Sequence, residues 1–143
     1  IYDIKNKLFL LVDKDTEAFE NVMTAFRLPK ETDTEKEERN KEIQKATVGA
    51  INIPLGISAL SYEALRIIDR VKEYGNKNAL SDIGVGCLLI HSGLEGGILN
   101  VKINLSGLTD EALKGEYVEK AEKLVTEGKK IRENILNYIN ERL

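Results

Sequence analysis

The chain has 143 residues and a mass of 16.0 kDa, which suits one domain with a single core and excludes two ordinary domains. With 42% hydrophobic and 31% charged residues, it does not match collagen-like, disordered or disulfide-scaffold proteins. Twenty-one Lys and Arg against 24 Asp and Glu give a net charge of -3, so no excess positive field would hold a phosphate backbone. We therefore expect no nucleic-acid partner.

Cysteine and histidine each occur once, as Cys87 and His91. A single cysteine cannot form an intrachain disulfide, and one histidine provides no ligand cluster, so we expect a reducing, cytoplasmic setting and no metal. The longest apolar run, Val85 to Ile90, stops at His91, far short of the roughly 20 residues that cross a bilayer. We expect no membrane contact.

Apolar residues recur at helical spacing along most of the chain, and strand patterns are nearly absent. The first predicted helix runs from about Leu8 and ends at Leu28-Pro29. Thr32 and Glu35 have the spacing of a capping box and predict the start of the second helix. That helix should continue to Gly75, with Pro54 able to kink it.

The third segment, Asn76 to Leu105, carries apolar residues all around a helix and predicts a buried, glycine-rich central helix. Thr109, with the two acidic residues after it, then caps a last helix whose apolar stripe faces the core or another copy. The expected architecture is an all-α bundle of long helices forming one domain over 1–143. Because the chain opens at Ile1 within a helical pattern, we expect that domain to be incomplete at its N-terminus.

A polar stripe lies along one side of the predicted third helix. At roughly 100° per residue its members fall close together: Asn78, Asp82, Leu89, Gly93, Asn100 and Asn104, with Gly86 and Gly97 slightly off the line. In one interpretation the stripe borders a groove. In the other, the glycines permit close helix crossing and the amides satisfy neighbouring backbone groups.

The groove interpretation implies a definite chemistry. A carboxylate lying in a cavity walled by Leu89 and glycine backbone suits proton transfer near neutral pH, which makes Asp82 the candidate base. Asn side chains both donate and accept hydrogen bonds, so they fit a flat, nitrogen-rich ligand. His91 lies on the opposite side of the same helix and is expected to be a packed or partly exposed residue, and Cys87 a small core residue.

Several blocks of the chain resemble one known family, the formiminotransferase-cyclodeaminase/methenyltetrahydrofolate cyclohydrolase family. They are Asp13-Lys14-Asp15-Thr16-Glu17-Ala18-Phe19, Leu28-Pro29-Lys30, Ile43-Gln44-Lys45-Ala46, Ile53-Pro54-Leu55, Gly75-Asn76-Lys77-Asn78-Ala79-Leu80-Ser81-Asp82-Ile83-Gly84-Val85-Gly86, and Leu99-Asn100-Val101-Lys102-Ile103-Asn104-Leu105. The resemblance covers the chain from about Leu8 onward, and the last helix matches in pattern only.

The resemblance implies an all-α homodimer that binds a reduced folate in a cleft lined by both subunits. Its members either hydrolyse methenyltetrahydrofolate to the 10-formyl form or close formiminotetrahydrofolate with loss of ammonia. Asp82 is then the expected catalytic residue, a carboxylate meets the pterin edge, and a lysine meets the glutamate tail. The expected substrate-binding residues are Asp13, Lys30, Asn76, Asn78, Gly86, Asn100 and Asn104.

Cyclohydrolase is the favoured activity because no formiminotransferase domain accompanies the printed chain. Cyclodeaminase is the alternative, and a folate-binding or helical interaction dimer without turnover is another. The tetrahydrofolate derivative is expected as substrate, with no metal. The family's N-terminal Pro-Gly-Gly-Gly-Ser motif has no match in the printed sequence, and His91 stands where the family commonly has a small residue.

Overall fold

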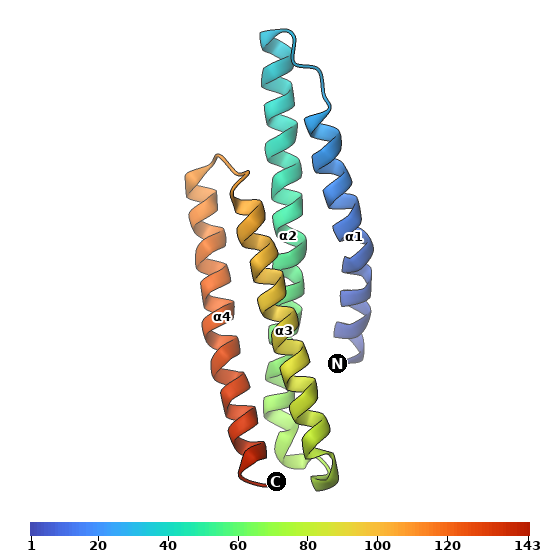
Figure 1. Cartoon of the computed structure of the whole chain (residues 1–143), viewed down its shortest axis with the longest axis vertical. Helices are drawn as coiled ribbons and strands as arrows, with labels where there is room; N and C mark the ends of the chain where they lie inside the picture. Colours follow the sequence, from blue (N-terminus) through green and yellow to red (C-terminus); the bar gives the residue numbers. More distant parts are fainter.

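Four long helices make up the computed structural model, which describes residues 1–143 apart from the side chain of Lys77. In chain order the elements are α1 (Tyr2–Phe26), α2 (Asp33–Val71), the short 3-10 helices η1 (Lys72–Tyr74) and η2 (Lys77–Ala79), α3 (Leu80–Leu105) and α4 (Glu111–Asn140). The four long helices run side by side along the molecule (Figure 1). The prediction of an all-α bundle is confirmed.

The helix starts follow local side-chain chemistry. Thr32 caps α2: its Oγ1 accepts from the Glu35 N–H at 3.2 Å, and the Glu35 carboxylate accepts from the Thr32 N–H at 2.8 Å. Asp110 caps α4 by accepting from the Leu113 N–H at 3.0 Å. The N–H groups in the first turn of a helix have no carbonyl partner inside the helix. The side-chain oxygens that accept from them therefore fix where each helix begins. The predicted capping box is confirmed.

The third helix begins later than predicted, at Leu80. Asn76 precedes it, and its Oδ1 accepts a hydrogen bond from the Asn78 N–H at 3.0 Å. Such local bonds compete with the helical pattern and favour turns. Asn76 and Asn78 therefore lie in the link before α3, and the prediction that Asn78 belongs to the helical stripe was wrong.

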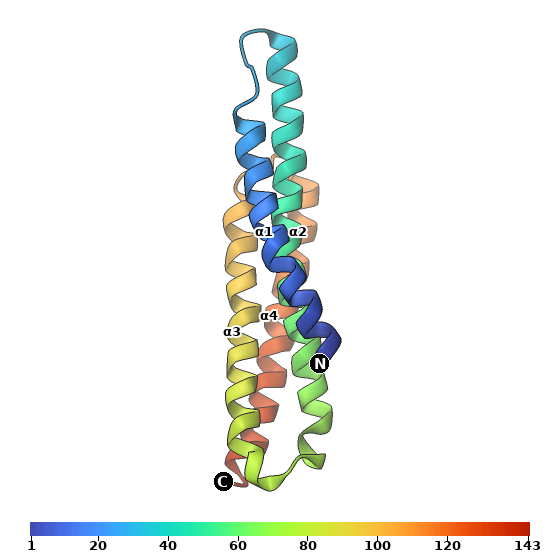
Figure 2. The ribbon, with the colours of Figure 1, turned by 90° about the vertical axis from the view of Figure 1, so that its right-hand side faces the viewer.

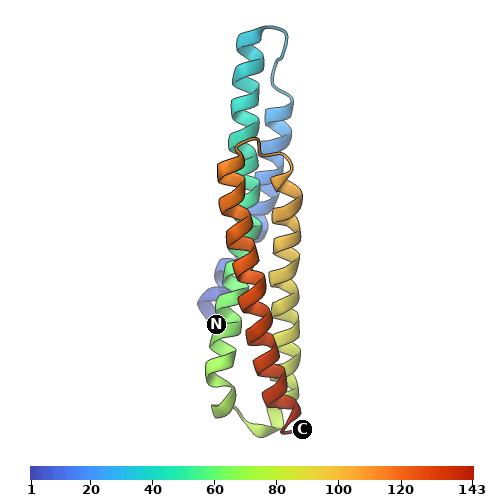
Figure 3. The same ribbon diagram turned by 90° about the vertical axis from the view of Figure 1, so that its left-hand side faces the viewer.

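The helix at the centre of the bundle is α2, which contacts the other three. One side of α2 carries α1, which crosses it obliquely, while α3 and α4 lie together on the other side (Figures 2 and 3). The first turns of α2 extend past the turn between α3 and α4 (Figure 1). Gln44 of α2 lies beside that turn, because its Nε2 donates to the Gly107 carbonyl oxygen at 3.0 Å. The loop that carries Lys30 and the α2–α3 link thus lie at opposite ends of the molecule.

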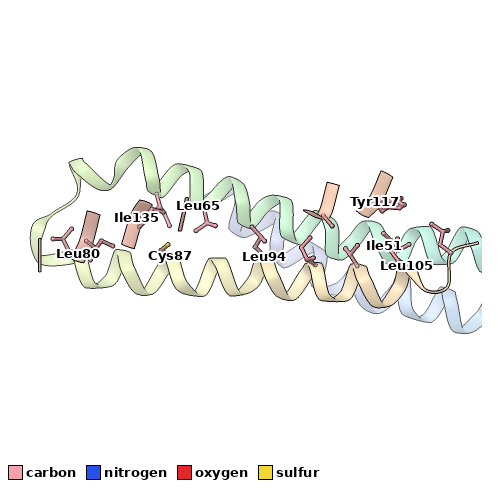
Figure 4. Packing of buried hydrophobic residues seen from close by; sticks show 14 residues of the cluster. Ile51, Leu65, Leu80, Cys87, Leu94, Leu105, Tyr117 and Ile135 are labelled. Carbon is pink, nitrogen blue, oxygen red and sulfur yellow. The ribbon is translucent and has the colours of Figure 1, made fainter. Parts of the chain in front are cut away.

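The hydrophobic core is formed by α2, α3 and α4 (Figure 4). Its fully buried members include Ile51, Leu65, Leu94 and Ile135. α3 buries one stripe there but leaves the apolar side chains of its other side 46–70% exposed, namely Val85, Leu88, Leu89, Leu99 and Ile103. The prediction that α3 is a buried central helix is therefore wrong for the single chain. The apolar residues all around α3 form two stripes, one packed in the core and one exposed.

Gly97 allows α3 to cross α2 at close range. A Cβ atom there would contact Ser58 Oγ and lie 2.7 Å from the Pro54 carbonyl oxygen. The Ser58 hydroxyl lies 3.0 Å from that oxygen and 2.9 Å from the Leu94 carbonyl oxygen, and so joins the two helices. At Gly97 the packing interpretation of the glycine stripe is correct.

By length and composition alone, two helical stretches could cross a membrane: Asp33–Tyr74 and Leu80–Leu105. A third of each apolar window is buried inside the molecule, and core helices of water-soluble proteins pass the same test. The absence of membrane contact stays a prediction.

Candidate functional site

Two hollows lie between α1 and α3, with α2 as their floor. The first, here called the upper recess, has a volume of about 250 Å³ and is lined by Asp15, Ala18, Phe19 and Val22 of α1, Ala50 of α2, and Asn100 and Asn104 of α3. The second, the lower hollow, has a volume of about 490 Å³ and a largely apolar lining that includes Phe9, Val12, Ile57, Leu89 and Gly93, together with Lys5.

Four members of the predicted stripe line these hollows. Leu89 and Gly93 border the lower hollow, and Asn100 and Asn104 border the upper recess. The groove interpretation is therefore confirmed for this part of α3. Gly86 has open space where a Cβ would lie, and the two hollows described above do not include it.

Asn104 has a structural task in the upper recess. Its Nδ2 donates to the Ala50 carbonyl oxygen at 2.8 Å. In a regular helix that carbonyl would accept from the N–H four residues later, but residue 54 is a proline and has none. Asn104 replaces the missing donor, as the packing interpretation of the amides expected.

Asn100 has no hydrogen-bond partner among the described residues, so its amide is free for a ligand. Asp15 and Phe19 of α1 line the same recess. A carboxylate, a free amide and an aromatic wall suit a flat ring that carries N–H donors along one edge. The residue pattern alone does not assign Asp15 or Phe19 to the site, although their spacing with Val22 is that of one helix face.

Asp82 does not lie in this groove in the single chain. It is exposed in the first turn of α3, and its 18-residue separation from Asn100 corresponds to about 27 Å along the helix. Asn76 and Asn78 are exposed near Asp82, whereas Lys30 is exposed at the far end of the bundle. Asp13 is exposed on α1 and lines neither hollow. One chain thus brings Asn100 and Asn104 together in the upper recess, whereas Asp82, Asn76 and Asn78 lie near one another outside it.

His91 and Cys87 belong to the core, as expected. The His91 ring is buried, and its Nε2 lies 3.9 Å from a Glu95 carboxylate oxygen. Burial lowers the pKa of His91, Glu95 partly offsets this, and Arg132 adds to the lowering. Burial likewise raises the pKa of the Cys87 thiol, which makes it a poor nucleophile.

No group of three His, Cys, Asp or Glu side chains placed to hold a metal ion occurs among the described residues. The absence of a metal in the functional protein stays a prediction.

Comparison with known proteins decides the family. Residues 1–140 match the family model described as formiminotransferase-cyclodeaminase. The chain belongs to the formiminotransferase-cyclodeaminase family.

Relatives in this family carry two kinds of name. The chain is 35% identical to a methenyltetrahydrofolate cyclohydrolase of Methylorubrum extorquens over 98% of this chain and 67% of that protein. It is 28% identical to the formimidoyltransferase-cyclodeaminase of Gallus gallus over 99% of this chain but 26% of that protein. This chain thus spans about two thirds of the length of the first relative and about a quarter of the length of the second.

A solved structure in the same family confirms the fold. A formiminotetrahydrofolate cyclodeaminase from Thermotoga maritima superposes with a TM-score of 0.86 and 26% identity, covering 98% of this chain and 66% of that one. The four-helix arrangement described above is thus shared with an enzyme of the family.

Proposed function

We propose that this chain is the helical folate-binding part of a methenyltetrahydrofolate cyclohydrolase. The observation that carries this proposal is the similarity to the Methylorubrum extorquens cyclohydrolase, which extends over 98% of the chain and includes both faces of the groove. The upper recess supports it, because a carboxylate, a free amide and an aromatic wall suit the donor-rich edge of a pterin.

The reaction adds water to the carbon that bridges two nitrogens of the folate. The water oxygen bonds to that carbon, and its proton passes to a base. The bond from the carbon to one nitrogen then breaks, leaving a formyl group on the other nitrogen and releasing one proton overall. Such a step needs a group that accepts a proton from water and returns it to the departing nitrogen.

Asp82 is the proposed base for this step, and Asn100 the proposed amide that orients the substrate. In the single chain these two residues stand about 27 Å apart along α3. We therefore propose that the functional unit is a homodimer, in which a second copy brings Asp82 to the recess of the first. The exposed apolar side of α3 supports this, because large contiguous apolar patches usually mark association surfaces.

Cyclodeaminase activity is the second candidate function. It is favoured by the close superposition on the Thermotoga maritima cyclodeaminase. In that reaction a folate nitrogen attacks the formimino carbon, and the proton that this nitrogen loses passes to the formimino nitrogen. Uptake of one further proton then breaks the bond from the carbon to that nitrogen and releases ammonia. Both reactions pass through a tetrahedral carbon between two nitrogens, so the same recess would serve either one.

Assays with two substrates decide between the candidates. The complete natural protein is supplied separately with methenyltetrahydrofolate and formiminotetrahydrofolate, and both the methenyl absorbance and free ammonia are followed. A cyclohydrolase removes the methenyl absorbance and releases no ammonia, whereas a cyclodeaminase releases one ammonia for each methenyl group formed. Tight binding of a reduced folate with neither conversion would instead identify a non-catalytic binding protein.

A further inference from the structure

The lower hollow and the upper recess share one wall of α1. The linings of the two hollows include residues spaced four and three apart along this helix: Leu8, Val12, Asp15, Phe19 and Val22. The first two line the lower hollow, and the other three line the upper recess. This spacing keeps all five side chains on one face of the helix, and less than one turn separates Val12 from Asp15. The wall therefore runs from one hollow into the other.

Between the two hollows, α3 carries glycines. Gly93 lines the lower hollow and Asn100 lines the upper recess. At about 100° per residue, the positions between them on this side of α3 are Gly96 and Gly97. Gly97 packs against α2, whereas no atom lies within 4 Å of a Cβ atom placed at Gly96. On this side, α3 has no side chain that would separate the lower hollow from the upper recess.

The two hollows carry opposite charges. Asp15 is the charged side chain in the lining of the upper recess, and Lys5 is the charged side chain in the lining of the lower hollow. Neither forms an ion pair with another described side chain. The Lys5 ammonium lies 4.8 Å from the centre of the Tyr2 ring, a contact that leaves its N–H donors free. The ten residues from Lys5 to Asp15 correspond to about 15 Å along α1.

We propose that the two hollows form one groove that binds a reduced folate lengthwise, with the pterin in the upper recess, the benzoyl ring in the lower hollow and the glutamate carboxylates at Lys5. A reduced folate has its chemical groups in this order: a ring edge rich in N–H donors, an aromatic ring, and carboxylates. At ordinary bond lengths its two ends are roughly 15–20 Å apart, close to the separation of Asp15 and Lys5. This inference rests on the proposed function.

This arrangement assigns the glutamate to Lys5 instead of Lys30. Lys30 follows the opposite end of α1, so a folate with its pterin at Asp15 and its benzoyl ring in the lower hollow directs its glutamate away from Lys30. Lys5 is exposed, so its ion pair is worth about threefold to fivefold in affinity. Lys5 is thus a specificity-determining residue, which favours folates over pteroates that lack the glutamate.

Ligands with and without the glutamate test the role of Lys5. The complete natural protein is titrated calorimetrically with 5-formyltetrahydrofolate, a stable reduced folate, and with 5-formyltetrahydropteroate, which lacks only the glutamate. Lys5→Gln should weaken binding of the folate about threefold to fivefold and leave binding of the pteroate unchanged. The matched control is Lys7→Gln, an exposed lysine of α1 that lines neither hollow, and it should change neither affinity. Equal effects of Lys5→Gln on both ligands, or no effect on either, overturn the proposal.

A side chain at position 96 tests whether the two hollows form one groove. Gly96→Leu should weaken binding of both ligands about tenfold and abolish the preference for the glutamate, because the benzoyl ring can no longer reach the lower hollow. Gly115→Leu, at a position on α4 that also has open space, should leave both affinities unchanged. Helical circular dichroism shows whether each variant folds, and Gly96→Ala gives a smaller effect in the same direction if the leucine variant does not. Wild-type affinities in the folded Gly96 variants overturn the proposal.

Turnover separates this inference from the proposed function. A wild type that binds neither ligand and converts neither methenyltetrahydrofolate nor formiminotetrahydrofolate refutes the proposed function and, with it, this inference. A wild type that converts a folate, but whose KM is unchanged by Lys5→Gln, refutes the position of the glutamate alone. A raised KM with unchanged kcat in Lys5→Gln supports both, because Lys5 then contributes to binding and not to the chemical step.

Discussion

The hydrogen bond between Asn104 and Ala50 predicts a specific coupling to Pro54. Replacing Asn104 by Ala removes the donor and leaves the half-buried Ala50 carbonyl without a partner. An unsatisfied buried acceptor costs about 1–3 kcal/mol, and partial exposure places this site near the lower end of that range. Replacing Pro54 by Ala restores a backbone N–H four residues after Ala50, which can take over the bond.

A double-mutant cycle measures this coupling. Free energies of unfolding are obtained from urea titrations followed by far-ultraviolet circular dichroism. Asn104→Ala should cost about 1 kcal/mol in the wild type and close to zero in the Pro54→Ala background. Asn100→Ala, which removes a neighbouring amide with no bond in the described structure, should change stability by less than about 0.5 kcal/mol. Equal costs of Asn104→Ala in both backgrounds would refute the reasoning.

Three further outcomes are expected. Gly97→Ala should destabilise the protein by about 1–3 kcal/mol in urea titrations, because its Cβ would lie 2.7 Å from a carbonyl oxygen, whereas Gly115→Ala, with open space around it, should be neutral or stabilising. Because the pKa of folded His91 lies below that of the unfolded chain, its contribution to stability is full above about pH 6.5 and is lost as the pH falls through the lower, folded pKa; His91→Gln should reduce this loss in unfolding titrations at pH 7 and pH 5. Asp15→Asn should raise the KM for the reduced folate more than it lowers kcat, with steady-state kinetics of Asp13→Asn as the matched control.

The helices could be predicted because their signals are local. The Thr32–Glu35 capping box and the periodic apolar stripes depend on neighbours within one or two turns, so the sequence contains all that determines them. The start of α3 was misplaced because Asn76 offers the backbone a competing turn bond, which a periodicity argument does not weigh.

The candidate site could be predicted only in part, because it is built by packing between distant segments. The helical stripe places Asn100 and Asn104 on one face, and both line the upper recess, but the spacing of one helix cannot show that Asp15 of α1 lines the same recess. Nor could periodicity show that the Asn104 amide donates to the Ala50 carbonyl oxygen, which Pro54 leaves without a backbone donor. Helical spacing groups Asp82 with Asn100 because both residues have a similar angle around the helix axis. It does not show that the two residues lie far apart along that axis.

The proposed reaction of this chain is the opening of the methenyl bridge of a reduced folate, with Asp82 as the base. The most direct measurement is the rate at which the complete natural protein removes the methenyl absorbance, compared among the wild type, Asp82→Asn and Asp13→Asn. We expect rapid loss with the wild type and Asp13→Asn, and at least about a hundredfold slower loss with Asp82→Asn. Equal rates for the wild type and Asp82→Asn would contradict it.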